Sequence, residues 1–156
     1  MPSKLGSGNC QRAMLTTILD YHTPILDIWQ KPTLQIKWFY TFQSYTTVKN
    51  YLYDKYHVEW ADRLRYYNGN WYGISTPSSE CAWLETPEWY CLPFCEFVKL
   101  VDFKYHLLTT SSRKILNTYT TIYISSQYSI YEVFPDVSEE KLNKVYKYME
   151  VNLLES

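Results

Sequence analysis

Residues 64–72 read Leu-Arg-Tyr-Tyr-Asn-Gly-Asn-Trp-Tyr and carry the strongest local structural signal in the chain. The pair Asn68-Gly69 favours a two-residue type I′ turn, because both residue types tolerate the positive φ angles that this turn requires. The aromatic residues on either side are typical of β-strands. The segment therefore predicts an antiparallel β-hairpin near the middle of the chain.

The segments before this hairpin carry alternating strand and helix signals. Apolar residues at every second position over 34–40 indicate a strand. Ser44 can cap a helix that continues to Tyr56. An earlier helix is expected over 9–22, where the apolar residues recur near the helical period, and Pro24 would close it.

The segments after the hairpin predict a helix, three strands and a final helix. Thr86-Pro87-Glu88 has a capping residue, a proline and an acid in the order that favours a helix start. The runs 98–108, 119–125 and 128–134 are typical of strands, and we expect them to form an antiparallel meander. Residues 139–154 place their apolar side chains on one helical face.

This order of elements predicts a single α+β domain over residues 1–156. Its sheet would have five to six strands, mostly antiparallel, with helices packed on one face. The composition is that of a folded protein, since 46% of the residues are hydrophobic, 20% are charged and the net charge is -1. The apolar runs are too short to cross a membrane or to serve as a signal peptide, so we expect a cytoplasmic protein that is not secreted.

The near-zero net charge conceals an uneven distribution of charge along the chain. Residues 1–78 carry more basic than acidic residues, and residues 79–156 carry more acidic than basic ones. Between residues 31 and 67 the basic residues alternate with Tyr, Trp and Phe, a combination that suits phosphate contacts and base stacking. The candidate DNA-binding residues are Lys49, Lys55, Arg63 and Arg65. The simpler interpretation is a solvated helix face beside a strand surface, with the aromatic rings filling the core.

Acidic residues in the second half suggest a metal-dependent hydrolytic site. Asp102 and Lys104 would share one face of the predicted strand 98–108, so that a carboxylate could hold a divalent metal beside an ammonium group. Glu85 or Glu88 would complete the site. The order Pro87-Glu88 then Asp102-Phe103-Lys104 resembles the metal-binding pattern of restriction-like nucleases, and residues 139–141, Glu-Glu-Lys, fit the same loose pattern.

A second motif resembles that of nucleotidyltransferases. Leu5-Gly6-Ser7 precedes Asp20 at a spacing similar to that family's, but the second acid of its pair is missing here. The glycine-rich phosphate-binding, zinc-protease and serine-hydrolase fingerprints do not occur in the sequence.

Abundant Tyr, Thr and Ile, few Gly and the α+β order of elements resemble the small nucleases of crenarchaeal filamentous viruses. This resemblance implies a viral protein from a hyperthermophilic host, a topology remotely similar to that of nucleotidyltransferases, and cleavage of linear double-stranded DNA that depends on a glutamate near mid-chain. Glu80, Glu85 and Glu88 are its counterparts by position, with Glu85 favoured and Glu88 second.

The sequence thus predicts a magnesium-dependent deoxyribonuclease that acts on double-stranded DNA and can assemble as a homo-oligomer. Glu85 or Glu88 would act as general base or metal ligand, Asp102 as the second metal ligand, and Lys104 as the group that stabilises charge on the phosphate. Two alternatives stay open, namely DNA binding without catalysis and a protein-interaction adaptor with exposed Tyr and Trp side chains.

Overall fold

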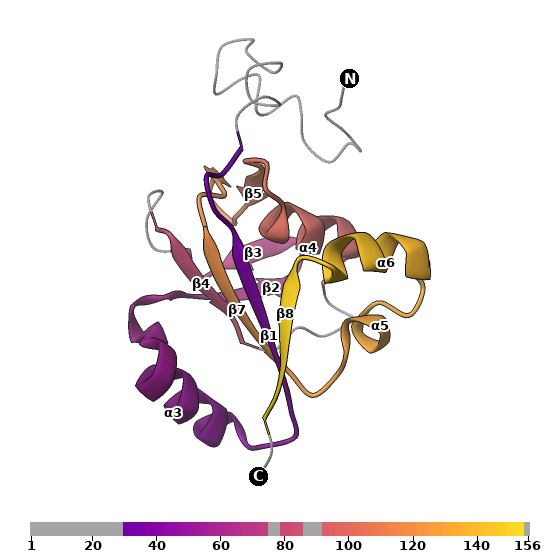
Figure 1. The fold of residues 1–156 in the computed structure, drawn as a ribbon. Helices are drawn as coiled ribbons and strands as arrows, with labels where there is room; N and C mark the ends of the chain where they lie inside the picture. Colours follow the sequence, from indigo (N-terminus) through magenta and orange to yellow (C-terminus); the bar gives the residue numbers. More distant parts are fainter. Residues whose placement is uncertain (1–29, 75–78, 86–91, 155–156) are drawn as a thin grey trace.

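A six-stranded sheet in the order β3-β2-β4-β7-β1-β8 runs through the computed structural model, which describes residues 30–74, 79–85 and 92–154 (Figure 1). A two-stranded sheet of β5 and β6 accompanies it. The elements in chain order are β1 (Gln35–Thr41), α3 (Tyr45–Tyr56), the 3-10 turn η1 (Val58–Trp60), β2 (Asp62–Tyr67), β3 (Asn70–Tyr72), β4 (Cys81–Leu84), α4 (Phe94–Val101), β5 (Leu107–Thr109), β6 (Lys114–Leu116), β7 (Thr121–Ser126), α5 (Ile130–Val133), α6 (Glu139–Tyr146) and β8 (Met149–Leu154). The predicted α+β class is confirmed.

The strands of the main sheet are mostly parallel, so the expectation of a mostly antiparallel sheet was wrong. β1 pairs in parallel with β7 and β8, and β4 pairs in parallel with β2 and β7. Within this sheet, the antiparallel pairing seen among the described residues is that of β2 with β3. Helices lie between β1 and β2, between β4 and β7, and between β7 and β8. Such a helical connection brings the chain back to the start of the sheet, so the next strand can run parallel to the previous one.

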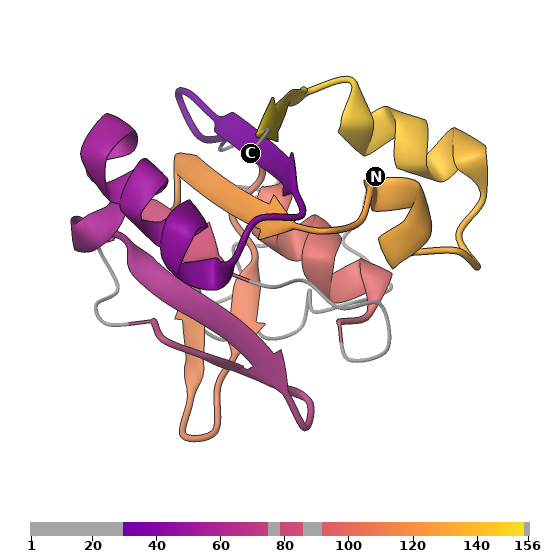
Figure 2. The same ribbon diagram turned by 90° about the horizontal axis from the view of Figure 1, so that it is seen from below.

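Helices cover both faces of the sheet, whereas the sequence predicted helices on one face only. α3 lies on one face, and α4, α5 and α6 lie on the other (Figure 2). Side chains alternate between these two layers along β1: Trp38 packs in the cluster with Phe97 of α4, and Phe39 packs in the cluster with Leu52 of α3. Burial on both faces is the usual state of a parallel sheet.

The predicted hairpin is confirmed. Tyr67 of β2 pairs with Asn70 of β3, and the two turn residues have positive φ angles, 51° at Asn68 and 80° at Gly69. Both signs match the type I′ turn that the Asn-Gly pair favours. Trp71 of β3 is buried, and its indole N–H donates to the Glu96 carboxylate at 3.1 Å.

Two glycines near this hairpin provide a matched test of backbone strain. A Cβ on Gly73 (φ 99°) would lie 1.7 Å from the Arg63 carbonyl oxygen, whereas a Cβ on Gly69 (φ 80°) would meet nothing within 4 Å. We expect Gly69→Ala to lower the free energy of unfolding by about 1 kcal/mol and Gly73→Ala to lower it by about 2 kcal/mol, because the clash adds to the strain. Urea denaturation measures both, and equal losses would contradict the close approach at Gly73.

The segment 98–108 is not one strand, which corrects the expected placement of Asp102 and Lys104. Its first part belongs to α4, whose residues Phe97, Leu100 and Val101 are buried at helical spacing. Asp102 follows the last helical residue as its C-cap. The two side chains therefore do not share a strand face.

Two further segments after β7 differ from their predictions. Within 128–134, Ser129 and Glu132 form a reciprocal capping box that starts α5, so a helix replaces the expected strand. The helix expected over 139–154 ends at Tyr146, and the chain continues as β8, which hydrogen bonds to the open edge of β1. A strand edge leaves backbone groups unpaired, and β8 satisfies those of β1.

The strands expected over 34–40 and 119–125 are confirmed as β1 and β7, and the helix capped by Ser44 is confirmed as α3. The expected helix over 9–22, the Leu5-Gly6-Ser7 motif with Asp20, and the helix start at 86–88 lie outside the described residues. Among the helices that the structure describes, none has the length and apolar character needed to cross a membrane.

Candidate functional site

The carboxyl ends of the parallel strands meet at one edge of the sheet, which Figure 2 views from below. α3 begins at this edge directly after β1, so its first residue, Tyr45, lies there. Glu85 follows the last residue of β4 at the same edge. Open sheets of parallel strands usually bind ligands beyond the carboxyl ends of their strands. A ligand site is therefore expected at this edge.

Glu85 is held at this edge by contacts from α3 and β7. The Tyr45 hydroxyl donates a hydrogen bond to the Glu85 carboxylate. The Tyr45 ring stacks on Trp83 of β4, with 6.0 Å between centroids and 5° between planes. Ser125 of β7 accepts from the Trp83 indole N–H at 3.1 Å and donates to the Glu85 carbonyl oxygen. The carboxylate thus has a fixed position beside an aromatic stack.

Cations from α3 and β2 surround this stack. The Arg63 guanidinium lies 5.5 Å from the ring centroids of both Trp83 and Tyr53. Lys49 places its Nζ 5.8 Å from the centroid of the same Tyr53 ring. Cations at such distances are attracted to the ring faces. We call the set of Tyr45, Lys49, Tyr53, Arg63, Arg65, Trp83 and Glu85 the Tyr45 cluster.

The electrostatics of Tyr45 show that both arginines belong to this cluster. Burial raises the pKa of Tyr45, and the hydrogen bond and the negative charge of Glu85 raise it further, while the charges of Arg63 and Arg65 oppose that increase. Arg65 lies two residues after Arg63 on β2, and both side chains are exposed. Side chains two residues apart on a strand point to the same face. The two guanidinium groups therefore form part of one exposed surface.

Lys55, the fourth predicted DNA-binding residue, lies on the other flank of α3. Its Nζ is 3.3 Å from the Tyr51 hydroxyl and 5.6 Å from the Tyr56 ring centroid. Beyond it, Lys37 of β1 and Glu150 of β8 form an ion pair at 3.0 Å. The structure thus places all four basic residues on the α3 side of the sheet, with three in the Tyr45 cluster and Lys55 across the helix.

Glu85 and Asp102 lie at opposite ends of the sheet. The carbonyl oxygen of Phe103, next to Asp102, accepts a hydrogen bond at 2.8 Å from the backbone of Lys31, which precedes β1. Glu85, in contrast, lies at the carboxyl end of the strands. The seven residues of β1 span about 23 Å. These two residues therefore do not form the shared metal site that the sequence predicted, and Glu88 lies outside the described residues.

Asp102 is instead engaged in its own local contacts. Its carboxylate is 2.8 Å from Nε2 of His106. Burial opposes ionisation of Asp102, but the hydrogen bond and charge of His106 and the backbone N–H groups of Lys104 and Phe103 outweigh burial and hold its pKa below the usual value. Lys104 pairs through its backbone with Gln30. Within residues 30–74, 79–85 and 92–154 no three His, Cys, Asp or Glu side chains are grouped so that they could hold a metal.

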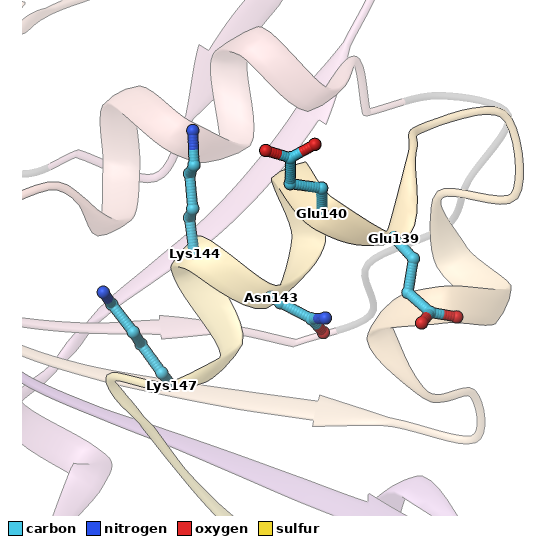
Figure 3. Close-up of a pocket in the computed structure, with 5 residues that line it drawn as sticks. All are labelled: Glu139, Glu140, Asn143, Lys144 and Lys147. Carbon is cyan, nitrogen blue, oxygen red and sulfur yellow. The ribbon is translucent and has the colours of Figure 1, made fainter.

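A surface hollow lies along α6, and its lining residues are Glu139, Glu140, Asn143, Lys144 and Lys147 (Figure 3). This hollow includes the acids of the alternative Glu-Glu-Lys match. Figure 3 shows the carboxylates of Glu139 and Glu140 pointing in different directions, so they do not converge on a common ligand. The hollow is lined by both acidic and basic side chains of one exposed helix, so it favours neither an anionic nor a cationic ligand.

Sequence reasoning identified the basic residues and Glu85 but missed Tyr45, Trp83 and Ser125. These three residues meet because β1, β4 and β7 end side by side, a fact that depends on the parallel pairing. The usable signal was the alternation of strands with helices, which favours parallel sheets. No protein-family model matches this chain, and no curated protein shows significant similarity to it.

Proposed function

We propose that the protein binds double-stranded DNA through the Tyr45 cluster and the exposed side of α3. One observation carries the proposal: Arg63 of β2 and Lys49 of α3 lie over the same Tyr53 ring, so the cations of two elements form one surface. Phosphate contacts from Lys and Arg supply most of the affinity in sequence-independent DNA binding.

The charge balance of this surface supports the proposal. Among the described residues, Lys49, Arg63 and Arg65 form no ion pair with a carboxylate, so their charges are available to phosphates. The Arg63 guanidinium already lies over the rings of Tyr53 and Trp83. These contacts limit the side chain's freedom, so Arg63 loses less conformational entropy when it binds a phosphate. Arg also matches the geometry of phosphate oxygens through its planar set of donors.

The dependence of DNA affinity on salt tests this proposal. Each phosphate contact contributes about -0.9 to the slope of log K against log salt concentration. We expect Arg63→Ala and Arg65→Ala each to weaken binding and to make the slope shallower by about 0.9. Arg113→Ala is the matched control, since Arg113 is an exposed arginine between β5 and β6. A slope that changes as much in the control as in the two variants would refute the assignment.

A second candidate function is cleavage of that DNA, which the position of Glu85 favours. Its carboxylate lies at the carboxyl ends of the parallel strands, beside the cations that would hold a phosphate. A carboxylate so placed can orient a water molecule or share a divalent metal such as magnesium. Glu88, three residues further along, stays a candidate second ligand. Asp102 has no part in this version of the site.

Digestion of linear and supercoiled double-stranded DNA, with magnesium or with excess chelator, tests the second candidate. We expect cleavage of the linear form with magnesium, and a loss of about 100-fold or more in Glu85→Gln. Glu140→Gln of α6 is the matched control, because its carboxylate is exposed on another element. Intact DNA in all lanes would exclude cleavage, and a mobility shift in those lanes would leave DNA binding as the function.

A further inference from the structure

β8 forms one lateral edge of the main sheet (Figure 1). It also carries apolar side chains that are exposed to solvent. It pairs with β1 on one side, and the described residues include no strand on its other side. Val151 is 41% exposed and Leu153 is 62% exposed. An edge strand of this kind leaves a row of backbone N–H and C=O groups ready to pair with another strand.

The usual devices that protect an edge strand are missing from β8. Residues 149–154 contain no proline and no lysine. Their one charged side chain, Glu150, is already neutralised by the ion pair with Lys37 at 3.0 Å. Proteins that remain monomeric commonly place charges or prolines on such an edge. The sequence of β8 therefore contains no lysine, proline or unpaired charge that would prevent pairing with another strand.

The side chains of β8 alternate between the two faces of the sheet. The register with β1 places Met149, Val151 and Leu153 on the face covered by α4 to α6, and Glu150 and Asn152 on the α3 face. The first set is apolar throughout. Glu150 and Asn152 are polar, and Asn152 donates to the Glu150 carboxylate at 3.1 Å. Leu154, the last residue of β8, also lies on the α3 face, where it packs against the cluster that contains Phe39. A partner strand must match both rows.

We propose that β8 pairs antiparallel with β8 of a second copy of this chain, about a two-fold axis at Val151. In this register Val151 lies opposite the partner's Val151, and Met149 lies opposite the partner's Leu153. On the α3 face Glu150 lies opposite the partner's Asn152. Apolar residues face apolar ones and the carboxylate faces an amide, so each of these cross-strand pairs within residues 149–153 is favourable.

Neighbouring registers are worse for identifiable reasons. An axis at Glu150 would place two carboxylates opposite each other, and like charges in that position are destabilising. An axis at Asn152 would place Glu150 opposite the partner's Leu154. If the partner strand were shifted by one residue, the apolar residues of one copy would lie opposite the polar residues of the other. The amino-acid sequence of β8 is thus self-complementary in one register.

The mass of the protein in solution tests the interface, and sedimentation velocity over a wide concentration range measures it. We expect the parental protein to sediment as a dimer of the 18.8 kDa chain. Val151→Lys places two ammonium groups opposite each other across the axis, and we expect a monomer. Trp60→Lys is the matched control, because Trp60 is 88% exposed on η1, and it should stay dimeric.

Mixing two variants tests the register itself. Val151→Lys and Val151→Glu should each be monomeric alone and should form a mixed dimer together, because lysine then faces glutamate across the axis. Circular dichroism confirms that both are folded. A parental protein that is monomeric at all concentrations, or a Val151→Lys dimer as tight as the parental one, would overturn the proposal. A mixture that stays monomeric would overturn the register.

Discussion

Replacing Asn117 with alanine is expected to lower the free energy of unfolding by about 4 kcal/mol, the largest effect of a single substitution foreseen here. Asn117 is fully buried, and its amide donates to the carbonyl oxygens of Lys99 at 2.7 Å and Leu100 at 2.9 Å. Its side-chain oxygen accepts from the Tyr119 backbone N–H at 3.0 Å. The substitution leaves all three backbone groups buried without these partners, and each costs about 1–3 kcal/mol.

These contacts also explain how α4 ends. The last carbonyl groups of a helix have no partner within the helix. Asn117, which lies between β6 and β7, supplies donors to two of them. It therefore connects the end of α4 to the segment that leads into β7. Urea denaturation measures the loss. Asn143→Ala is the matched control, because Asn143 is exposed and accepts one hydrogen bond from Tyr131, so a loss in Asn117→Ala no larger than in this control would disprove the account.

Replacing Lys31 with methionine is expected to stabilise the protein by about 3 kcal/mol at neutral pH. Lys31 is only 3% exposed, and its Nζ has no hydrogen-bond partner among the described residues. Burial lowers the pKa of this amine from 10.5 to about 8, against the opposing attraction of Asp102. Methionine keeps the apolar stem and removes the charge whose desolvation destabilises the folded state.

The same pKa shift gives the sign of the pH dependence. Between pH 8 and pH 10.5 the unfolded chain binds more protons at Lys31 than the folded protein does. Stability therefore rises with pH through this window in the parental protein, and the contribution of this residue is absent in Lys31→Met. Thermal denaturation at several pH values in that range measures the difference. Lys141→Met, at an exposed position on α6, controls for the general effect of removing a lysine.

A destabilised Lys31→Met would contradict this account. It would mean that the ammonium group is satisfied in solution, with Asp102 as a source of compensating charge. Equal slopes of stability against pH in the parental protein and in Lys31→Met would also contradict the account, because they would show that the pKa of Lys31 does not change on folding.

The β8 edge and the Tyr45 cluster are different surfaces, but a β8 dimer would present both copies of the cluster to one DNA molecule. A two-fold axis that pairs β8 with its copy in an antiparallel manner is perpendicular to the sheet, so the α3 faces of both copies lie on the same side. Arg63 and Lys49 of each copy would then face one long DNA molecule together. Two linked surfaces bind more tightly than one because the second contact is intramolecular. Val151→Lys should accordingly weaken binding to long DNA more than binding to short DNA.

Local sequence alone determined several elements of this fold. The Asn68-Gly69 turn, the Ser44 cap of α3 and the alternation in β1 act over a few residues, so a short window contains their full physical cause. The capping box of Ser129 and Glu132 belongs to the same class of signal, although the apolar residues around it suggested a strand. The basic and aromatic content of the first half likewise identified the residues that now surround Tyr53.

Tertiary structure decided the direction of the strands, the state of two ambiguous segments and the composition of the site. Residues 149–154 form a strand because β1 offers an unpaired edge, and α4 is a helix because its apolar residues pack at helical spacing and Asn117 satisfies its last carbonyl groups. Glu85 meets Tyr45 because parallel strands end together, and the length of β1 keeps Asp102 away. Such contacts join residues far apart in the chain, and their free energy depends on burial and on backbone groups that no short window contains.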